Sequence, residues 1–161
     1  MIDKAEQEQL KRLDVSISYA TETDEFWSFV GNKHNQRWTW LAIEKTSGAV
    51  VAWHNGKRTD DDLQALLNLM CDIPINKYYT DDWGGYKRML PTEKHIVGKA
   101  ETWKIERKNL NFRTHIKRLS RRTICYSRSE LIHDNVIGMY IERYYYRQGS
   151  FSNQCINLFK P

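Results

Sequence analysis

Residues 26–54 read FWSFVGNKHNQRWTWLAIEKTSGAVVAWH and contain three largely apolar runs, at 26–30, 37–44 and 49–54. Aromatic and β-branched residues dominate these runs, and such residues are enriched in β-strands. The segments between the runs are short, polar and contain glycine, which is typical of turns. Consecutive strands joined by short turns form an antiparallel meander, so we expect this stretch to build half of a sheet.

The pattern changes from strand to helix after this meander. Thr59 is a suitable N-cap because its hydroxyl can accept a backbone N–H, and the acidic residues 60–62 favour a first helical turn through the helix dipole. Leucines follow at helical spacing. In chain order we then expect a strand at 77–80, a loop or short helix at 82–86, a strand at 94–98, a helix at 101–122, and a last helix through 131–140 that starts at Ser127 or Ser129.

The resulting order is three strands, a helix, a strand, a short helix, a strand and long helices, which is the order of a ribonuclease-H-like fold. We therefore expect an α/β protein with a mixed five-stranded sheet and flanking helices. A chain of 161 residues is about one domain. The expected division is an N-terminal leader at 1–20, a ribonuclease-H-like domain at 21–146 and a loose C-terminal tail at 147–161.

Charge is distributed unevenly along the chain. Residues 1–100 carry 13 Lys and Arg against 15 Asp and Glu, whereas residues 101–161 carry 12 against 5. A basic half can hold a polyanion, and such asymmetry suggests a nucleic-acid partner. The alternative is a helix whose basic face is only solvated, and composition does not decide between the two.

Cysteine and histidine usage predicts neither a disulfide framework nor a zinc site. Cys71, Cys125 and Cys155 are few, widely spaced and odd in number, so we interpret them as reduced thiols. No pair forms C-x-x-C, and the five histidines do not complete a zinc-ligand spacing. The sequence has no apolar span of about 20 residues and no signal peptide. We therefore expect a cytoplasmic protein that is neither secreted nor inserted in a membrane.

Three acidic residues occur where the expected elements begin or end. Asp24 precedes the first strand, Asp81 follows the strand at 77–80, and Glu106 lies at the head of the basic helix. Two carboxylates at strand positions and a third on a later helix suit two-metal phosphoryl transfer, in which acidic side chains hold two cations roughly 3.5–4 Å apart. Mg²⁺, or Mn²⁺, prefers such oxygen ligands. These three residues are therefore the candidate catalytic residues and metal ligands.

Other acidic residues compete with these three. Asp82 is the rival of Asp81, and because side chains alternate along a strand, only one of the pair can point into a site. The acidic residues 60–62 are interpreted as helix-start residues. Glu22 and Glu25 flank Asp24 and are expected to face solvent.

The helix expected at 101–122 has two distinct faces. The apolar residues 105, 112, 116 and 119 lie on one face, which should pack inward. Four polar residues lie on a neighbouring face, which should look outward: Glu106, Asn109, Arg113 and Lys117.

The basic residues that follow Glu106 have two interpretations. As a solvated face they have no partner, whereas as a DNA track they bind phosphates without reading sequence. The nearby candidate site for DNA cleavage favours the second interpretation. The candidate DNA-binding residues are Arg107, Lys108, Arg113, Lys117, Arg118, Arg121 and Arg122.

The tryptophans are expected to serve mainly in packing. We interpret Trp27, Trp38, Trp40 and Trp53 as core and sheet residues. Trp83 lies in a loop next to Asp81 and is the one aromatic residue considered for DNA contact.

Five short motifs occur in order along the chain: Asp24-Glu25-x-Trp27-x-x-Val30-Gly31, Gln36-Arg37-Trp38, Thr80-Asp81-x-Trp83-x-x-Tyr86, Ile105-Glu106-Arg107-x-Asn109-Leu110-Asn111-x-Arg113, and His133-Asp134-x-Val136-Ile137-Gly138. In these motifs the sequence resembles the catalytic region of bacterial insertion-sequence transposases of the insertion element 1 family, of the InsB type. The resemblance covers residues 22–145. Several multi-residue matches in order are a specific signal, which a lone set of acidic residues would not be.

The resemblance implies a ribonuclease-H-like fold and an Asp-Asp-Glu metal triad that nicks DNA and joins the freed 3′ end to a target. The triad falls on Asp24, Asp81 and Glu106, and the 24 residues between the last two match the family spacing. Arg113 matches a basic residue two helical turns after the glutamate. The resemblance also implies two Mg²⁺ or Mn²⁺ ions, double-stranded DNA as partner, a homo-oligomer on DNA, and association with the bacterial nucleoid.

The chain also departs from a complete transposase of this family. The upstream zinc-binding and helix-turn-helix region that recognises element ends is absent from this chain, which we therefore expect to be the downstream, catalytic part. Residues 147–161 do not match the family. Two alternatives stay open: a ribonuclease-H-like nuclease that only hydrolyses DNA, and an inactive remnant that binds DNA or other proteins.

Overall fold

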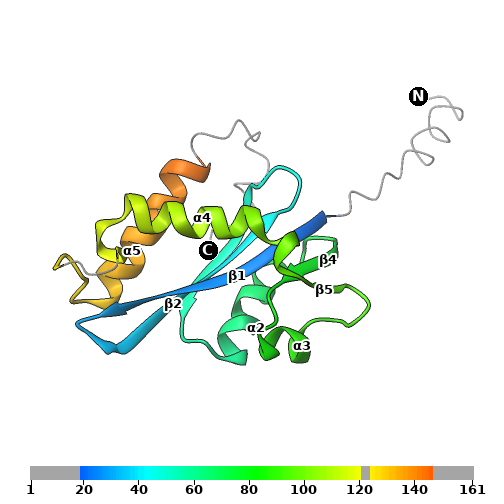
Figure 1. Cartoon of the computed structure of the whole chain (residues 1–161), viewed down its shortest axis with the longest axis horizontal. Helices are drawn as coiled ribbons and strands as arrows, with labels where there is room; N and C mark the ends of the chain where they lie inside the picture. The colour runs from blue at the N-terminus through cyan, green and yellow to red at the C-terminus, as the bar shows by residue number, and fades with distance from the viewer. Residues whose placement is uncertain (1–18, 121–123, 147–161) are drawn as a thin grey trace, which may run out of the picture.

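The computed structural model describes residues 19–120 and 124–146 (Figure 1). The leader expected at 1–20 lies almost wholly outside the described residues, and the tail expected at 147–161 lies entirely outside them. Three residues singled out from the sequence also lie outside them: Arg121, Arg122 and Cys155.

In the described part of the chain, five strands form one sheet and four α-helices flank it. The strands are β1 (Tyr19–Val30), β2 (Asn32–Glu44), β3 (Val50–Gly56), β4 (Ile75–Thr80) and β5 (His95–Val97). The α-helices are α2 (Asp60–Asn68), α3 (Gly84–Met89), α4 (Trp103–His115) and α5 (Glu130–Ile141). The shorter helical turns are η1 (Lys99–Glu101), η2 (Lys117–Leu119) and η3 (Glu142–Tyr146).

The strand order in the sheet is β3-β2-β1-β4-β5. Strands β1, β2 and β3 form the expected antiparallel meander, whereas β4 lies parallel to β1 and β5 lies parallel to β4. The turn between β1 and β2 is a single residue, Gly31, whose φ of 76° suits glycine. This mixed order is that of a ribonuclease-H-like sheet, so the expected fold class is confirmed.

Helices cover both faces of the sheet (Figure 1). On one face α4 and α5 pack against β1 and β2, with Phe26 and Phe112 in the core between them. On the other face α2 and α3 pack against the sheet around Trp40 and Tyr86. Side chains alternate along a strand, so successive residues of β1 contribute to different layers.

Strand β1 is longer than the sequence indicates. The expected strand began at Phe26, but β1 begins at Tyr19 and places Asp24 inside the strand. Thr21, Glu22 and Thr23 are almost completely buried there, although their polarity gives no strand signal. The extension depends on tertiary pairing, because this part of β1 lies beside β4.

Helix starts agree well with the sequence. Thr59 caps α2, where its Oγ1 accepts a hydrogen bond from the Asp62 backbone N–H at 3.3 Å. Ser129 caps α5 and accepts from the Ile132 N–H. Ser127, the other expected cap, does not cap the helix. It is buried, and its Oγ lies 2.8 Å from Nδ1 of His133.

The helix expected at 101–122 is wrong in its extent. α4 ends at His115, and Ile116 adopts an extended conformation before the turn η2. The four apolar residues expected to pack inward are all buried, but Ile116 and Leu119 follow α4 and do not share a helical face with Ile105 and Phe112. The Ser120 hydroxyl donates to the Arg113 carbonyl, which satisfies one acceptor left open at the helix end.

Among the helices of the described residues, none combines the length and the apolar character that a membrane crossing requires.

Candidate active site

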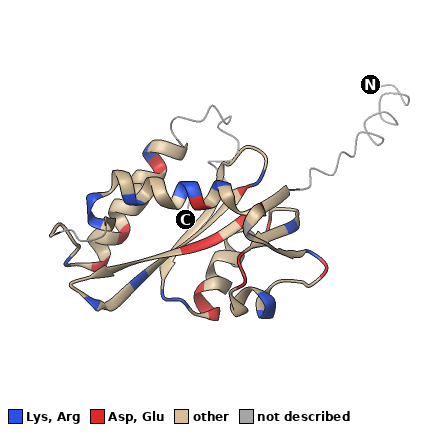
Figure 2. Cartoon of the chain, viewed as in Figure 1, with Lys and Arg blue, Asp and Glu red and all other residues tan. Residues whose placement is uncertain are grey.

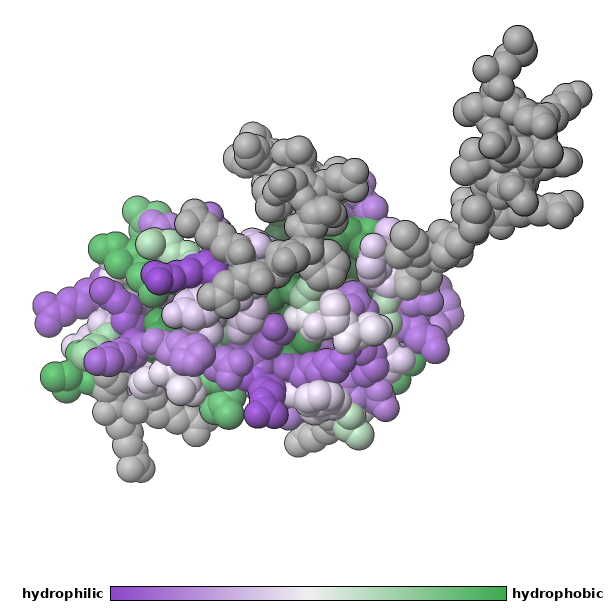
Figure 3. Space-filling model, turned by 90° about the horizontal axis from the view of Figure 1, so that it is seen from above, coloured by the Kyte–Doolittle hydropathy of each residue, from purple (hydrophilic) through white to green (hydrophobic). Residues whose placement is uncertain are grey.

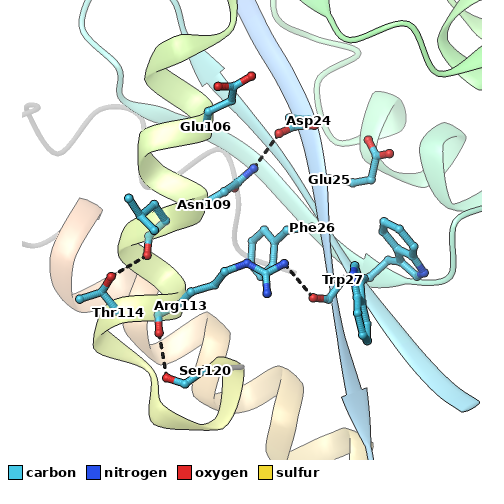
Figure 4. A pocket seen from close by; sticks show the side chains of 11 residues that line it. Asp24, Glu25, Phe26, Trp27, Glu106, Asn109, Arg113, Thr114 and Ser120 are labelled. Carbon is cyan, nitrogen blue, oxygen red and sulfur yellow. Dashed lines mark hydrogen bonds between the residues drawn. The ribbon is translucent and has the colours of Figure 1, made fainter. Parts of the chain in front are cut away.

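Asp24 lies in the middle of β1 and faces α4. Its Oδ2 accepts a hydrogen bond of 2.8 Å from Nδ2 of Asn109, and Figure 4 shows this contact between strand and helix. Glu106 lies one helical turn before Asn109, so it projects from the same side of α4 (Figure 4). The Oδ1 atom of Asn109 is buried and has no hydrogen-bond partner among the described residues. The helix therefore presents one carboxylate and one amide toward Asp24.

Glu22 positions the start of α4, although it was expected to face solvent. It lies two residues before Asp24 on the same side of β1, and it is fully buried. Its Oε2 accepts from the Ile105 N–H at 2.9 Å, while Nζ of Lys45 lies 3.7 Å from Oε1. The N-cap residue of α4, Thr102, makes no side-chain cap hydrogen bond, so Glu22 supplies the acceptor from another element. An acidic group at this end also suits the helix dipole.

Asp81 follows β4, the parallel neighbour of β1. Glu22 of β1 is paired with Tyr79 of β4. Asp24 and Asp81 each lie two residues further along their strands, so they lie beside each other. Its Oδ1 accepts from the Trp83 N–H at 2.9 Å, and the residue is half-buried.

Asp82, the rival of Asp81, is paired with a basic residue. It is exposed and forms a 2.5 Å ion pair with Lys87. This ion pair lowers the pKa of Asp82, as is usual for a carboxylate beside a cation.

Asp81 and Glu106 are close enough to Asp24 to influence its ionisation electrostatically. Burial, followed by the charge of Glu25 and then the charges of Asp81 and Glu106, raises the pKa of Asp24 from 3.8 to about 7. A backbone hydrogen bond from Glu25 opposes this increase. Within residues 19–120 and 124–146, however, no three His, Cys, Asp or Glu side chains are already gathered into a metal-binding group.

Glu25 lies on the opposite face of β1 from Asp24 and is buried, so its expected exposure is also wrong. Its Oε1 accepts from Nε of Arg58 at 2.7 Å, and its Oε2 accepts from the Tyr86 hydroxyl at 2.7 Å. Burial raises the pKa of Glu25, and the two hydrogen-bonded partners oppose the increase. Its charge is thus compensated locally, unlike that of Asp24.

A cavity of about 680 Å³ lies beside Asp24. Strand β4 pairs with β1 only as far as Glu22, and beyond that residue no strand of the described chain pairs with this edge of β1. The cavity is lined by the residues of β1 that follow, 24–27. Because that edge is open, side chains from both faces of β1 line the cavity. The lining residues are Asp24, Glu25, Phe26, Trp27, Trp38, Glu106, Asn109, Leu110, Arg113, Thr114 and Ser120.

Among the expected DNA-binding residues, Arg113 lies in this cavity. Its guanidinium donates to the Trp27 carbonyl at 3.1 Å and lies over the Phe26 ring (Figure 4). Arg107 is exposed on α4, whereas Lys108 is half-buried with Nζ 3.9 Å from the centre of the Tyr145 ring.

Two further expected DNA-binding residues, Lys117 and Arg118, lie in η2 rather than on the α4 face that carries Glu106. Figure 2 shows basic residues along α4 and the turn after it, with acidic residues in the middle of β1.

The sequence analysis did not predict the contacts of three residues at this site, Asn109, Glu22 and Glu25. Asn109 was placed on the face of Glu106 but was given no role, and it is buried against Asp24 rather than turned outward. Glu22 could have been recognised from the two-residue period of a strand, if the strand had been extended toward the N-terminus. Glu25 had no comparable signal, because its partners Arg58 and Tyr86 are distant in sequence.

The chain is similar to known proteins in sequence and in fold. Residues 17–147 match a family model described as IS1 transposase. The InsB protein of insertion element iso-IS1n from Shigella dysenteriae is 50% identical over 123 residues, which are 76% of this chain and 94% of that protein. The InsB protein of insertion element IS1 from Shigella flexneri is 39% identical over 126 residues, covering 78% of this chain and 96% of that protein.

Among solved structures, a chain of the simian T-cell lymphotropic virus intasome in complex with PP2A regulatory subunit B56 gamma has a similar fold. The TM-score is 0.54 with 12% identity, over 89% of this chain and 55% of that chain. This likeness supports the fold alone.

Proposed function

Because the chain belongs to the IS1 transposase family and is the catalytic domain of a DNA transposase, we propose that the cavity beside Asp24 is where it cleaves and joins DNA strands. The candidate metal ligands are Asp24, Asp81 and Glu106, which would hold two Mg²⁺ or Mn²⁺ ions. The observation that carries this proposal is the position of Asp24, which lines one cavity with Glu106, accepts a hydrogen bond from Asn109 of the same helix and lies on the strand that neighbours β4, which Asp81 follows.

The donor set fits a hard divalent cation. Carboxylate oxygens are the ligands that Mg²⁺ prefers. Within the described residues, none of the three acidic side chains forms an ion pair with Lys or Arg. Other acidic residues are paired, as Glu25 is with Arg58 and Asp82 is with Lys87. The negative charge at the site is thus left for a ligand to neutralise.

Two such cations, held by Asp24, Asp81 and Glu106, would supply activation of the attacking oxygen and stabilisation of the leaving 3′ oxygen. The protein's own residues orient the ligands. Asn109 holds one oxygen of Asp24, and Glu22 holds the first turn of α4, which carries Glu106. Arg113 lies in the same cavity, where a guanidinium can bind a DNA phosphate.

The surface around the site is polar and carries basic residues along α4 and the turn after it (Figure 2). The face seen from the side of α4 is largely hydrophilic, with the apolar groups more numerous toward one end (Figure 3). We propose that DNA phosphates contact the basic residues Arg107, Lys108, Arg113, Lys117, Arg118, Arg121 and Arg122. Because α4 ends before Lys117, the contacts would spread over the helix and the following turn rather than one helix face.

We further propose that the chain works as a homo-oligomer on the ends of its element, together with a DNA-recognition region of the zinc-binding and helix-turn-helix type. It would act in the bacterial cytoplasm, associated with the nucleoid. The proposal includes strand transfer and not only hydrolysis, in keeping with the family.

The direct test combines nicking and strand transfer on element-end DNA with Mg²⁺. The wild type should do both, whereas Asp24→Asn and Glu106→Gln should do neither while keeping DNA affinity. Asp82→Asn is the matched control, because Asp82 is exposed and paired with Lys87. Hydrolysis without strand transfer, or cleavage that survives Glu106→Gln, would contradict the proposal.

A further inference from the structure

Trp27 and Trp38 form a pair that neither core of the protein uses. They are directly opposite each other on β1 and β2, so their side chains lie on the same face of the sheet. Both are half-buried, and neither packs into the two hydrophobic cores of the described residues. Both line the cavity beside Asp24 and Glu106. They therefore pair across the sheet, as expected of sheet residues, but they are not core residues.

Trp83, the aromatic residue considered for DNA contact, packs against the protein core instead of lining the cavity. Its ring centre lies 5.3 Å from that of Trp40 and 5.5 Å from that of Tyr86. It packs against the core formed with α2 and α3, and it does not line the cavity. Its ring is thus occupied by protein contacts.

Arg58 holds the Trp38 ring in place. Its guanidinium lies 5.0 Å from the centre of the Trp38 ring and is anchored by a 2.6 Å ion pair with the buried Glu25. A cation over an aromatic face stabilises the arrangement. The indole of Trp38 is therefore ordered on one side while the residue still lines the cavity.

We propose that Trp27 and Trp38 form a stacking surface for an unpaired nucleobase next to the reacting phosphate. Trp27 lies three residues from Asp24, which corresponds to about 10 Å along a strand. Phosphates of one DNA strand are about 3.4 Å apart along the helix axis, so the stacked base lies within about three nucleotides of the phosphate at Asp24. Indole rings stack on any base, so the surface recognises an unpaired base without reading its identity.

Trp27 also stands at the open edge of β1, where Arg113 binds its carbonyl (Figure 4). A strand that crosses this edge can place its phosphate on the side of Asp24 and α4 and its base on the side of Trp27. The inference depends on the proposed function for the position of the phosphate, but base stacking can be measured without cleavage.

The experiment compares the binding of two short duplexes of the same sequence, one fully paired and one ending in a few unpaired nucleotides that include 2-aminopurine. The wild-type chain should prefer the unpaired end about five- to 150-fold, which corresponds to ~1–3 kcal/mol of stacking, and should quench the 2-aminopurine fluorescence. Trp27→Phe keeps an aromatic ring and should retain most of this preference. Trp27→Leu keeps apolar bulk without the ring and should lose it.

Phe29→Ala is the matched control, because Phe29 lies on the same face of β1, contacts Tyr126 and does not line the cavity. It should bind both duplexes as the wild type does. If Trp27→Leu melts at a lower temperature, Trp38→Leu provides an independent variant at the opposite strand. Equal binding of both duplexes by the wild type, or a full preference in both leucine variants, would overturn the inference.

The outcomes for the two proposals are distinguishable. A wild type that nicks DNA but shows no preference for unpaired ends would overturn the stacking surface and leave the proposed function intact. A preference for unpaired ends that depends on Trp27, in a chain that does not nick DNA with Mg²⁺, would support the stacking surface and contradict the proposed function.

Discussion

Nδ2 of Asn109 lies 2.8 Å from Oδ2 of Asp24, in a contact between residues that are 85 positions apart. This hydrogen bond joins the middle of β1 to the helix that carries Glu106. It orients a carboxylate whose charge no basic side chain of the described residues neutralises. Asn109 is therefore a positioning residue for the proposed metal site.

Asn109→Ala should reduce metal affinity or the nicking rate about 10- to 100-fold, as is usual when a group that orients a ligand is removed. DNA affinity should stay unchanged, because Asn109 carries no charge. Metal titration of nicking activity checks this expectation. Asn68→Ala on α2 is the control, since the side chain of Asn68 is exposed and accepts a hydrogen bond from Gln64 on the helix surface. A variant of Asn109 with unchanged metal dependence would show that the hydrogen bond is only structural.

Asp24→Asn should stabilise the protein at neutral pH when divalent cations are absent. The pKa of Asp24 is about 7 in the folded state against an ordinary value of 3.8, so the folded state binds the proton more tightly. Stability from this group is fully present below pH ~4 and is lost as the pH rises through about 7. Asparagine does not ionise, so the variant should gain melting temperature relative to wild type at pH 8 but not at pH 4. An equal difference at both values would argue against the raised pKa.

Mg²⁺ or Mn²⁺ should raise the melting temperature of the wild type. A cation that binds only the folded state at one hundred times its dissociation constant adds about 2.7 kcal/mol. Asp24→Asn and Asp81→Asn should reduce the shift, whereas Asp82→Asn should keep it because Asp82 faces solvent. Thermal melting during metal titration is the measurement, and an equal shift in all variants would place the cation elsewhere.

Glu22→Ala should destabilise the fold by about 1–3 kcal/mol, because the buried N–H of Ile105 loses its acceptor. Glu22→Gln should cost less, since the amide oxygen can still accept. Glu101→Gln is the control: Glu101 pairs with the same Lys45 at 2.9 Å but is half exposed, where an ion pair contributes little. Denaturant unfolding of the three variants distinguishes the cap from the ion pair.

Arg113→Ala should weaken binding to all DNA sequences alike. The loss of one phosphate contact should reduce the slope of log affinity against log salt by about one unit. Arg88→Ala is the control, because Arg88 is paired with Asp60 on the far face of the sheet. An unchanged salt slope in Arg113→Ala would remove this residue from the DNA surface.

The sequence alone determined the class of fold and the candidate acidic residues. Alternating apolar runs predicted the meander, Thr59 predicted the start of α2, and the change of period predicted the order of elements. These features are local, because strand and helix periods and caps depend on residues that are neighbours in sequence. The motifs around Asp24, Asp81 and Glu106 led to the family for the same reason.

The tertiary structure decided what those residues contact. Glu22 and Glu25 were expected in solvent, but their partners Ile105, Arg58 and Tyr86 lie far away in sequence, and no local pattern encodes such contacts. The apolar spacing of residues 105–119 is that of a longer helix, but α4 ends at His115 and Ile116 is buried from an extended conformation. The spacing of apolar residues is the same in both cases, so it could not show where the helix ends. Trp27 lies at an unpaired edge of β1 because β4 pairs with β1 only as far as Glu22. Which part of a strand edge is unpaired is decided when the sheet assembles, so the sequence of β1 alone does not show it.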